Sequence, residues 1–419
     1  MRKAVVALVL VAVLAGPASA ESVSPPLLAL AQAVARAKAA GFDVRLAQAD
    51  AAIASADAAS SRTSLRPQVS VSANALDANE PQLGMPVARQ AYASASVTLP
   101  IYSPAAALTA RAADASALAM RTSAAAASND AVFATAQAYR RVQLADAVVA
   151  ARRAAVAAGE SHLVVTQQRV AAGKSARYLL ARDRAALATA QQAQEDAASE
   201  RDQSANDLQA LLDMEIAAIT VEPLERLFVS DSRDATRERA LRNRAAYVAA
   251  EQRLVAAQGT VDAARAAYRP SATLTAQTYN GASSPALGSA GGQVQISASL
   301  PVVDGGARTA AAAKARAEYE RARAMRDQVR AAVLRDVANA WREYEAASRD
   351  VTIATSALAD AQEQQRIAAV RENAGKAIAA EVLDAISAVA SARETLARNI
   401  ARSDVAVAAI HHAAGDAAP

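Results

Sequence analysis

Cysteine does not occur in this chain, and histidine occurs only three times. The first absence excludes disulfides, thiol catalysis and cysteine-ligated metals. His162, His411 and His412 have no carboxylate partners at the spacing of a metal site or a catalytic triad, and no glycine-rich phosphate-binding loop is present. The sequence therefore predicts a protein that is not an enzyme and holds neither metal nor cofactor. We expect His162 on the surface of a helix and the other two histidines in a mobile tail.

Aromatic residues are scarce, at 3%, and long apolar runs are missing after the start of the chain. Residues 1–20 have the pattern of a secretory signal peptide, with Arg2 and Lys3 before an apolar run and a small-residue cleavage site at its end. No later stretch is apolar over the length of a transmembrane helix. The net charge of +4 is nearly balanced, without the basic block that nucleic acid would favour. We expect an exported chain that lacks a spanning helix and does not bind nucleic acid.

Two stretches alternate apolar and polar residues, which is the signature of a strand with two different faces. They predict β-hairpins at about 67–102 and about 270–303. Each strand has roughly the 9 to 11 residues that a tilted strand needs to cross a bilayer. The loops are rich in residues that turn a chain in water. For an exported chain, such hairpins indicate contact with outer membrane lipid in a Gram-negative bacterium.

The two hairpins lie roughly 200 residues apart, and both open with Arg-Pro and close with Leu-Pro, so the sequence predicts an internal twofold repeat. The first repeat covers 21–212 and the second 231–409, separated by an irregular segment at 213–230. A disordered tail is expected at 410–419. Ala-rich sequence predicts long helices around the hairpins, with a single helix before each hairpin. After the first hairpin a helix of roughly 100 Å is expected to end at Gly173.

Four strands per chain cannot close a barrel, and an open sheet in lipid would leave backbone groups at its edges without hydrogen bonds. Copies of the chain are therefore expected to share one barrel. Two copies would give a barrel of eight strands, and side chains fill the interior of a barrel of that size. Three copies would give a barrel of twelve strands, which leaves room for a bore. The polar face of every strand favours the bore.

In the combination of its features, the sequence resembles the TolC family of outer membrane efflux proteins, also called outer membrane factors. These features are the signal peptide, the twofold repeat, the Arg-Pro strand openings, the Leu-Pro-Val-Val-Asp-Gly-Gly exit and the Ala-rich helices with glycine turns. The resemblance covers essentially the whole mature chain. It implies a mixed, mostly α fold: a homotrimeric channel in which each chain gives four strands to a shared twelve-strand β-barrel and long helices to a periplasmic α-barrel.

The resemblance also implies a function and partners. The protein would be the passive exit duct of a tripartite efflux or type I secretion system, located in the outer membrane and extending into the periplasm. It would work with a periplasmic adaptor (a membrane fusion protein) and an inner-membrane pump of RND or ABC type. The sequence does not separate drug, metal and protein cargo. The alternative is an exported helical adhesin or a periplasmic adaptor without a pore.

In this family, acidic side chains after the second glycine turn pinch the periplasmic end shut. Glu381 and Asp384 lie in the matching stretch and, three residues apart, share a helix face. Arg182 stands at the matching place in the first repeat, where it is expected to pair with Asp384 and close the tip. The alternative is a solvated helix face on which Glu381 pairs with Lys376 or Arg371.

The family further implies adaptor docking at the two glycine turns, which both read Ala-Gly-Lys here; as an alternative, they are only helix caps. The residues concerned are Gly173, Lys174, Gly375 and Lys376. The chain is expected to pass between strand and helix at prolines and at a glycine pair. These residues are Pro67, Pro100, Pro270, Pro301, Gly305 and Gly306.

Overall fold

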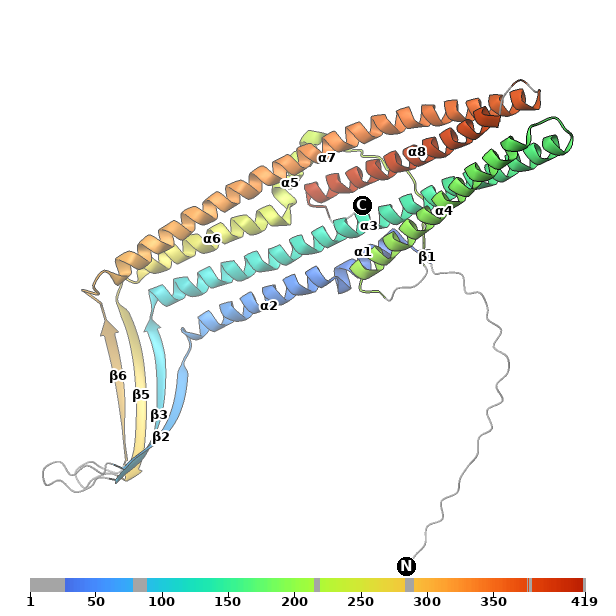
Figure 1. Cartoon of the computed structure of the whole chain (residues 1–419). Coiled ribbons are helices and arrows are strands. Elements are labelled where there is room, and N and C mark those ends of the chain that lie inside the picture. The colour runs from blue at the N-terminus through green and yellow to red at the C-terminus, as the bar shows by residue number, and fades with distance from the viewer. Residues whose placement is uncertain are drawn as a thin grey trace, which may run out of the picture.

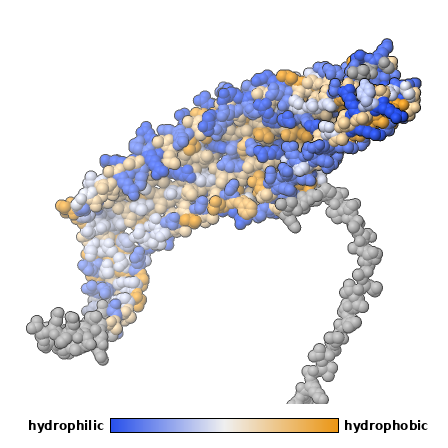
Figure 2. All heavy atoms as spheres, viewed as in Figure 1, coloured by the Kyte–Doolittle hydropathy of each residue, from blue (hydrophilic) through white to orange (hydrophobic). Residues whose placement is uncertain are grey.

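The computed structural model describes residues 27–77, 89–214, 219–282, 290–374, 376 and 379–416. It shows a long rod of helices with a sheet projecting from one end (Figure 1). The hydropathy of the surface changes along this length, with hydrophilic residues dense at the far end of the rod and paler or hydrophobic residues over the sheet (Figure 2). The predicted signal peptide at 1–20 lies outside the described residues.

The sheet has four antiparallel strands in the order β2-β3-β5-β6. Their bounds are Gln68–Asp77 (β2), Arg89–Tyr102 (β3), Ser271–Ala282 (β5) and Ala290–Ser299 (β6). The pairs β2-β3 and β5-β6 are the two predicted hairpins, and the pairing of β3 with β5 joins them into one sheet. The outer edges of β2 and β6 have no partner in the described part of the chain.

The two faces of this sheet differ in chemistry because side chains alternate along each strand. Val69, Val97, Ala276 and Val294 are register partners across all four strands, and Val69 and Val294 are 70% and 75% exposed. On the opposite face the equivalent row is polar and begins with Ser70 and Ser96, whose hydroxyls are 2.8 Å apart. One face is thus exposed and apolar, and the other is lined by hydroxyl and amide groups.

Two helices of extraordinary length dominate the rod, and each returns through a shorter antiparallel partner. The first pair is α3 (Pro104–Ala171, 68 residues) with α4 (Arg177–Leu211), and the second is α7 (Ala307–Asn373, 67 residues) with α8 (Ala379–Ala414). At 1.5 Å per residue α3 is about 100 Å long, as expected. Helix α3 also packs against α8, which brings the two pairs together (Figure 1). No helix among the described residues is long and apolar enough to span a bilayer.

The prediction of one continuous helix before each hairpin is wrong. The first is divided into α1 (Leu30–Ala40) and α2 (Phe42–Thr63) and the second into α5 (Arg233–Asn243) and α6 (Ala245–Ala266). The breaks lie at Gly41 and Arg244, whose ψ angles of 133° and 109° are extended. Tertiary contacts explain the second break, because the Arg244 guanidinium donates to the main-chain oxygen of His412.

The predicted disorder of 410–419 is also wrong up to residue 416, since α8 runs to Ala414 and Ile410 is 1% exposed. The helix ends in a hydrogen-bonded cap: Gly415 has a φ of 84°, and the amide of Asp416 donates to the main-chain oxygen of His411 at 3.0 Å. The ring of His412 stacks on Phe133 at 4.5 Å. The histidine pair is therefore part of a packed helix end.

A small junction surrounds the middle of α3. Strand β1 (Leu27–Leu28) pairs in parallel with β4 (Thr220–Val221), which lies in the segment predicted to be irregular. The fully buried Tyr139 of α3 binds β1 and the residue after β4: its hydroxyl donates to Leu28 O at 2.8 Å and accepts from the amide of Glu222 at 3.0 Å. This junction fixes the start of the described chain against the rod.

Candidate functional site: the tips of the two helical hairpins

The turn between α3 and α4 is a Schellman cap. Gly173 takes a φ of 69°, in the left-handed region that favours glycine. The amide of Lys174 donates to Arg169 O at 2.8 Å, and the amide of Gly173 donates to Val170 O at 3.1 Å. The predicted helix stop at Gly173 is confirmed, and Lys174 is exposed at the tip.

The turn between α7 and α8 repeats one of these bonds, since the amide of Lys376 donates to Arg371 O at 2.8 Å. Gly375 lies outside the described residues. Arg371 and Lys376 thus stand where Arg169 and Lys174 stand in the first repeat. Both turns act as helix caps, and adaptor docking at them stays a prediction.

The predicted gate residues lie just beyond this second turn. Glu381 Oε2 is 3.0 Å from Arg371 Nη1, so the alternative pairing within one helical hairpin is formed. Asp384 is exposed and, among the described residues, forms no ion pair. Both acids line a groove of about 460 Å³ between α7 and α8. Arg182 is exposed and, in the described part of the chain, forms no ion pair, so the predicted Arg182–Asp384 bridge is not formed within one chain.

A buried cluster of ionisable groups lies about two to three turns below the first tip. His162, with 3% of its side chain exposed, has Nε2 3.3 Å from Asp183 Oδ2 and Nδ1 3.5 Å from Glu372 Oε2. Arg169 Nη1 lies 3.1 Å from the other Glu372 oxygen. The expectation that His162 is a surface residue is therefore wrong.

Sequence reasoning could have found half of this cluster. His162 and Asp183 lie nearly the same number of residues before and after Gly173, so an antiparallel hairpin that turns at this glycine brings them side by side. Glu372 could not have been found in this way, because it comes from the other repeat and meets His162 only through tertiary packing.

Further contacts hold the two hairpins together along their length. Arg152 of α3 makes a two-point ion pair with Glu394 of α8, with Nη2 and Oε2 3.0 Å apart. Apolar residues of α7 and α8, including Val382 and Ile386, pack with partly buried alanines of α3. The tips are therefore two helical hairpins joined by ion pairs on either side of a small apolar cluster.

At the other end of the rod, the strand-to-helix passages use the predicted residues in different ways. Pro100 lies within β3, next to a register shift between Pro100 and Tyr102, and a bulge is a position where a strand accepts proline. Pro301 follows the end of β6. Pro67 and Pro270 directly precede β2 and β5.

The glycine pair makes the last passage. Gly305 and Gly306 have φ values of 65° and 93°, and Gly306 is the N-cap of α7. The Asp304 carboxylate accepts hydrogen bonds from the Gly306 and Arg308 amides at 3.1 and 3.0 Å and from the Arg308 side chain. The bond from the Arg308 side chain lowers the pKa of Asp304 most. The glycine pair therefore turns the chain where it enters α7.

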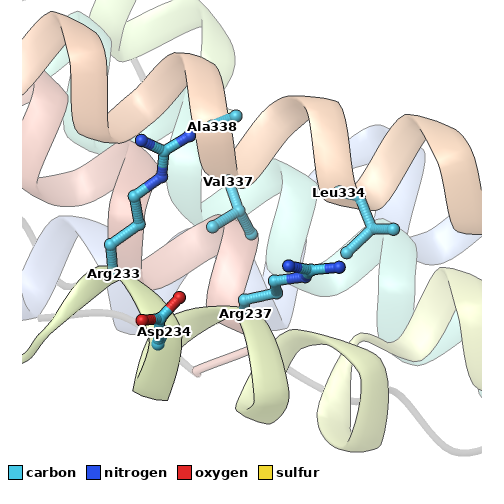
Figure 3. A pocket seen from close by; sticks show the side chains of 6 residues that line it. All are labelled: Arg233, Asp234, Arg237, Leu334, Val337 and Ala338. Atoms are coloured by element: carbon cyan, nitrogen blue, oxygen red, sulfur yellow. The ribbon is translucent and has the colours of Figure 1, made fainter.

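A separate groove of about 470 Å³ lies between α5 and α7, midway along the rod (Figures 1 and 3). Arg233 and Arg237 of α5 extend over an apolar wall that includes Leu334 and Val337 of α7 (Figure 3). None of the residues predicted to be functional lines this groove.

The long helical hairpins, the two-faced sheet and the twofold repeat define the class as an outer membrane channel fold. Residues 236–416 match the family model described as "Outer membrane efflux protein". No curated protein matches the sequence. The predicted resemblance to the TolC family and the predicted fold class, mixed and mostly α, are confirmed.

Three solved structures illustrate the likeness. The outer membrane protein VceC of Vibrio cholerae has a TM-score of 0.81 at 20% identity, over 92% of this chain and 96% of that chain. The open state of the MtrE outer membrane channel of Neisseria gonorrhoeae has a TM-score of 0.80 at 20% identity, over 93% and 89%. The CmeC outer membrane channel of Campylobacter jejuni has a TM-score of 0.79 at 18% identity, over 92% and 85%.

Proposed function

We propose that three copies of this chain form the passive exit duct of a tripartite efflux or type I secretion system. The duct crosses the outer membrane of a Gram-negative bacterium and extends into the periplasm. The observation that carries this proposal is the open sheet, which has an exposed apolar face, a polar face and two unpaired outer edges among the described residues.

The unpaired outer edges of the sheet favour a barrel that is shared between copies of the chain. In lipid, each unpaired backbone group costs several kcal/mol, so a spanning sheet has to close. A barrel made from β2 of one copy and β6 of the next satisfies both edges and turns the apolar face with Val69 and Val294 toward lipid. Three copies give twelve strands, and the polar row that begins with Ser70 then lines a bore.

The rod argues for a duct that continues beyond the membrane. A helix of about 100 Å is more than three times the thickness of the hydrocarbon core. Its far end is hydrophilic (Figure 2), as a surface in the periplasm should be. There the turns at Gly173, Lys174 and Lys376 would meet a periplasmic adaptor, which connects the duct to an inner-membrane pump that supplies the energy.

The tip would be the gate, and its two acids would contribute to it unequally. Arg371 balances the charge of Glu381, whereas Asp384 has no partner among the described residues. Around a threefold axis, Asp384 would form the effective negative ring. A cation about 8 Å from three carboxylates in water gains about 0.5 kcal/mol from each, or roughly a tenfold rise in local concentration.

Cell fractionation followed by electrophoresis without boiling tests the duct itself. We expect heat-resistant trimers in the outer membrane fraction. A monomer in the periplasm would contradict the proposal and favour the adhesin or adaptor alternative.

Single-channel recording in planar bilayers tests the gate, with the parent compared with Asp384→Asn, Glu381→Gln and the double variant Glu381→Ala, Asp384→Ala. We expect a small cation-selective conductance in the parent. Asp384→Asn should reduce the selectivity more than Glu381→Gln, and the double variant should conduct more. Equal effects of the two single variants would show that the Arg371 pair does not persist in the trimer.

A further inference from the structure

His162 occupies an unusual position because both nitrogens of a buried imidazole face carboxylate oxygens. The distances are 3.3 Å to Asp183 and 3.5 Å to Glu372, and the two carboxylate side chains are 1% and 7% exposed. In the described part of the chain, neither Asp183 oxygen has a hydrogen-bond partner. Among the described residues, the imidazole is therefore the one basic group within ion-pair distance of the buried Asp183 carboxylate.

The chemistry of imidazole makes this arrangement depend on a proton. Neutral histidine has one N–H donor and one lone pair, so one of its nitrogens would face a carboxylate oxygen with no hydrogen between them. Doubly protonated histidine presents an N–H toward each carboxylate, at ion-pair distances of 3.3 and 3.5 Å. The charge count agrees: two carboxylates against Arg169 leave a buried net charge of −1, which a protonated imidazole cancels.

The cluster joins elements that belong to different hairpins. His162 and Arg169 come from α3, Asp183 from α4 and Glu372 from the last turn of α7. On α8, Glu381 binds Arg371, the residue next to Glu372. His162 thus faces a charged group on α4 and on α7, and its contact with Glu372 lies between the α3-α4 hairpin and the α7-α8 hairpin.

We propose that His162 is a proton-operated latch between the two hairpins at the tip. With the imidazole protonated, Glu372 stays bound between His162 and Arg169 and the hairpins remain together. When the proton leaves, the repulsion between a carboxylate and a ring lone pair favours separation of α7 from α3. This inference rests on the proposed function, because separation of the hairpins is what would widen the duct at its tip.

The absence of cysteine allows a direct test. Spin labels on Lys174→Cys and Lys376→Cys, one at each tip, report the separation of the hairpins by pulsed electron resonance. Trimers with a single labelled chain are obtained by co-expression with an excess of cysteine-free chain. We expect the ratio of separated to joined hairpins to fall roughly tenfold as the pH is lowered from about 8 to about 5.5, the range in which histidine changes charge.

His162→Gln should abolish this pH response, because the amide has no titratable proton, and Asp183→Asn should weaken it. His411→Gln is the matched control: it removes a histidine at the opposite end of α8 and should leave the response intact. All variants are first checked for heat-resistant trimers, so that a lost response is not mistaken for a lost fold.

A parent protein whose distances do not change with pH would overturn the latch. A His162→Gln variant that keeps the full pH response would also overturn the latch, because the response would then come from acids such as Glu381 and Asp384. Conductance of the same samples separates the two proposals. If the protein forms channels but the distance between the labels does not change with pH, only the latch is refuted. If the distances change as predicted but no channels form, only the duct is refuted.

Discussion

Tyr139→Phe removes a single hydroxyl from the junction of α3, β1 and β4. In the parent this hydroxyl binds Leu28 O at 2.8 Å and the Glu222 amide at 3.0 Å, and Tyr139 is fully buried. The phenylalanine ring keeps the packing but leaves both backbone groups without their partner. A buried unsatisfied group costs about 1–3 kcal/mol, and the low end applies because Glu222 itself is exposed and water can approach.

Two such groups give about 2 kcal/mol, which corresponds to roughly a 30-fold increase in local opening. Hydrogen exchange of the detergent-solubilised protein, followed by mass spectrometry, measures that opening without requiring reversible unfolding. We expect peptides that contain β1 and β4 to lose protection while α7 is unaffected. Tyr178→Phe is the control, since Tyr178 is 71% exposed at the hairpin tip.

Unchanged protection of β1 and β4 in Tyr139→Phe would refute this reasoning. It would mean that solvent replaces the hydroxyl at no cost and that the junction is held by apolar packing alone. Faster exchange in Tyr178→Phe as well would show that the assay reports a general loosening of the protein.

Three further predictions concern the duct and its stability. Asp384→Asn should lower cation selectivity by roughly tenfold and Glu381→Gln by less, as measured by reversal potentials. Burial raises the pKa of Asp404, so its ionised form is disfavoured in the folded protein, and the stability of the parent falls as the pH rises above the usual carboxyl value through the raised one. The Tm of Asp404→Asn relative to that of the parent, followed by circular dichroism, should therefore be higher at about pH 7.5 than at about pH 4.5. Gly306→Ala should speed exchange at the start of α7, because the φ of 93° costs a side chain about 1–2 kcal/mol, whereas Gly292→Ala, at a glycine without a positive φ, should not.

Local sequence patterns determined the elements of this protein. Alternation predicted the starts of both hairpins and the end of the first to within about one residue, because a two-faced strand has to repeat every two residues. The second hairpin ends at Ser299, earlier than predicted. Gly173 was identifiable as the end of α3 since a left-handed cap favours glycine. The same local rules missed the helix breaks at Gly41 and Arg244, and at Arg244 the side chain bonds to the distant main chain of His412.

The candidate site was only partly visible in the sequence. The stretch with Glu381 and Asp384 could be placed near the second turn, but its charge balance depends on Arg371, which folds back across that turn. The contact of His162 with Glu372 and the packing of His412 against Phe133 join residues distant in the sequence, so no local pattern predicts them.

By itself the sequence determined a repeated unit of long helices and a two-faced hairpin, because periodicity and turn residues act over a few positions. Tertiary structure decided which charges meet. Burying an ionisable group is favourable only when partners compensate its charge, and in this chain the partners of His162 and Asp404 come from other helices.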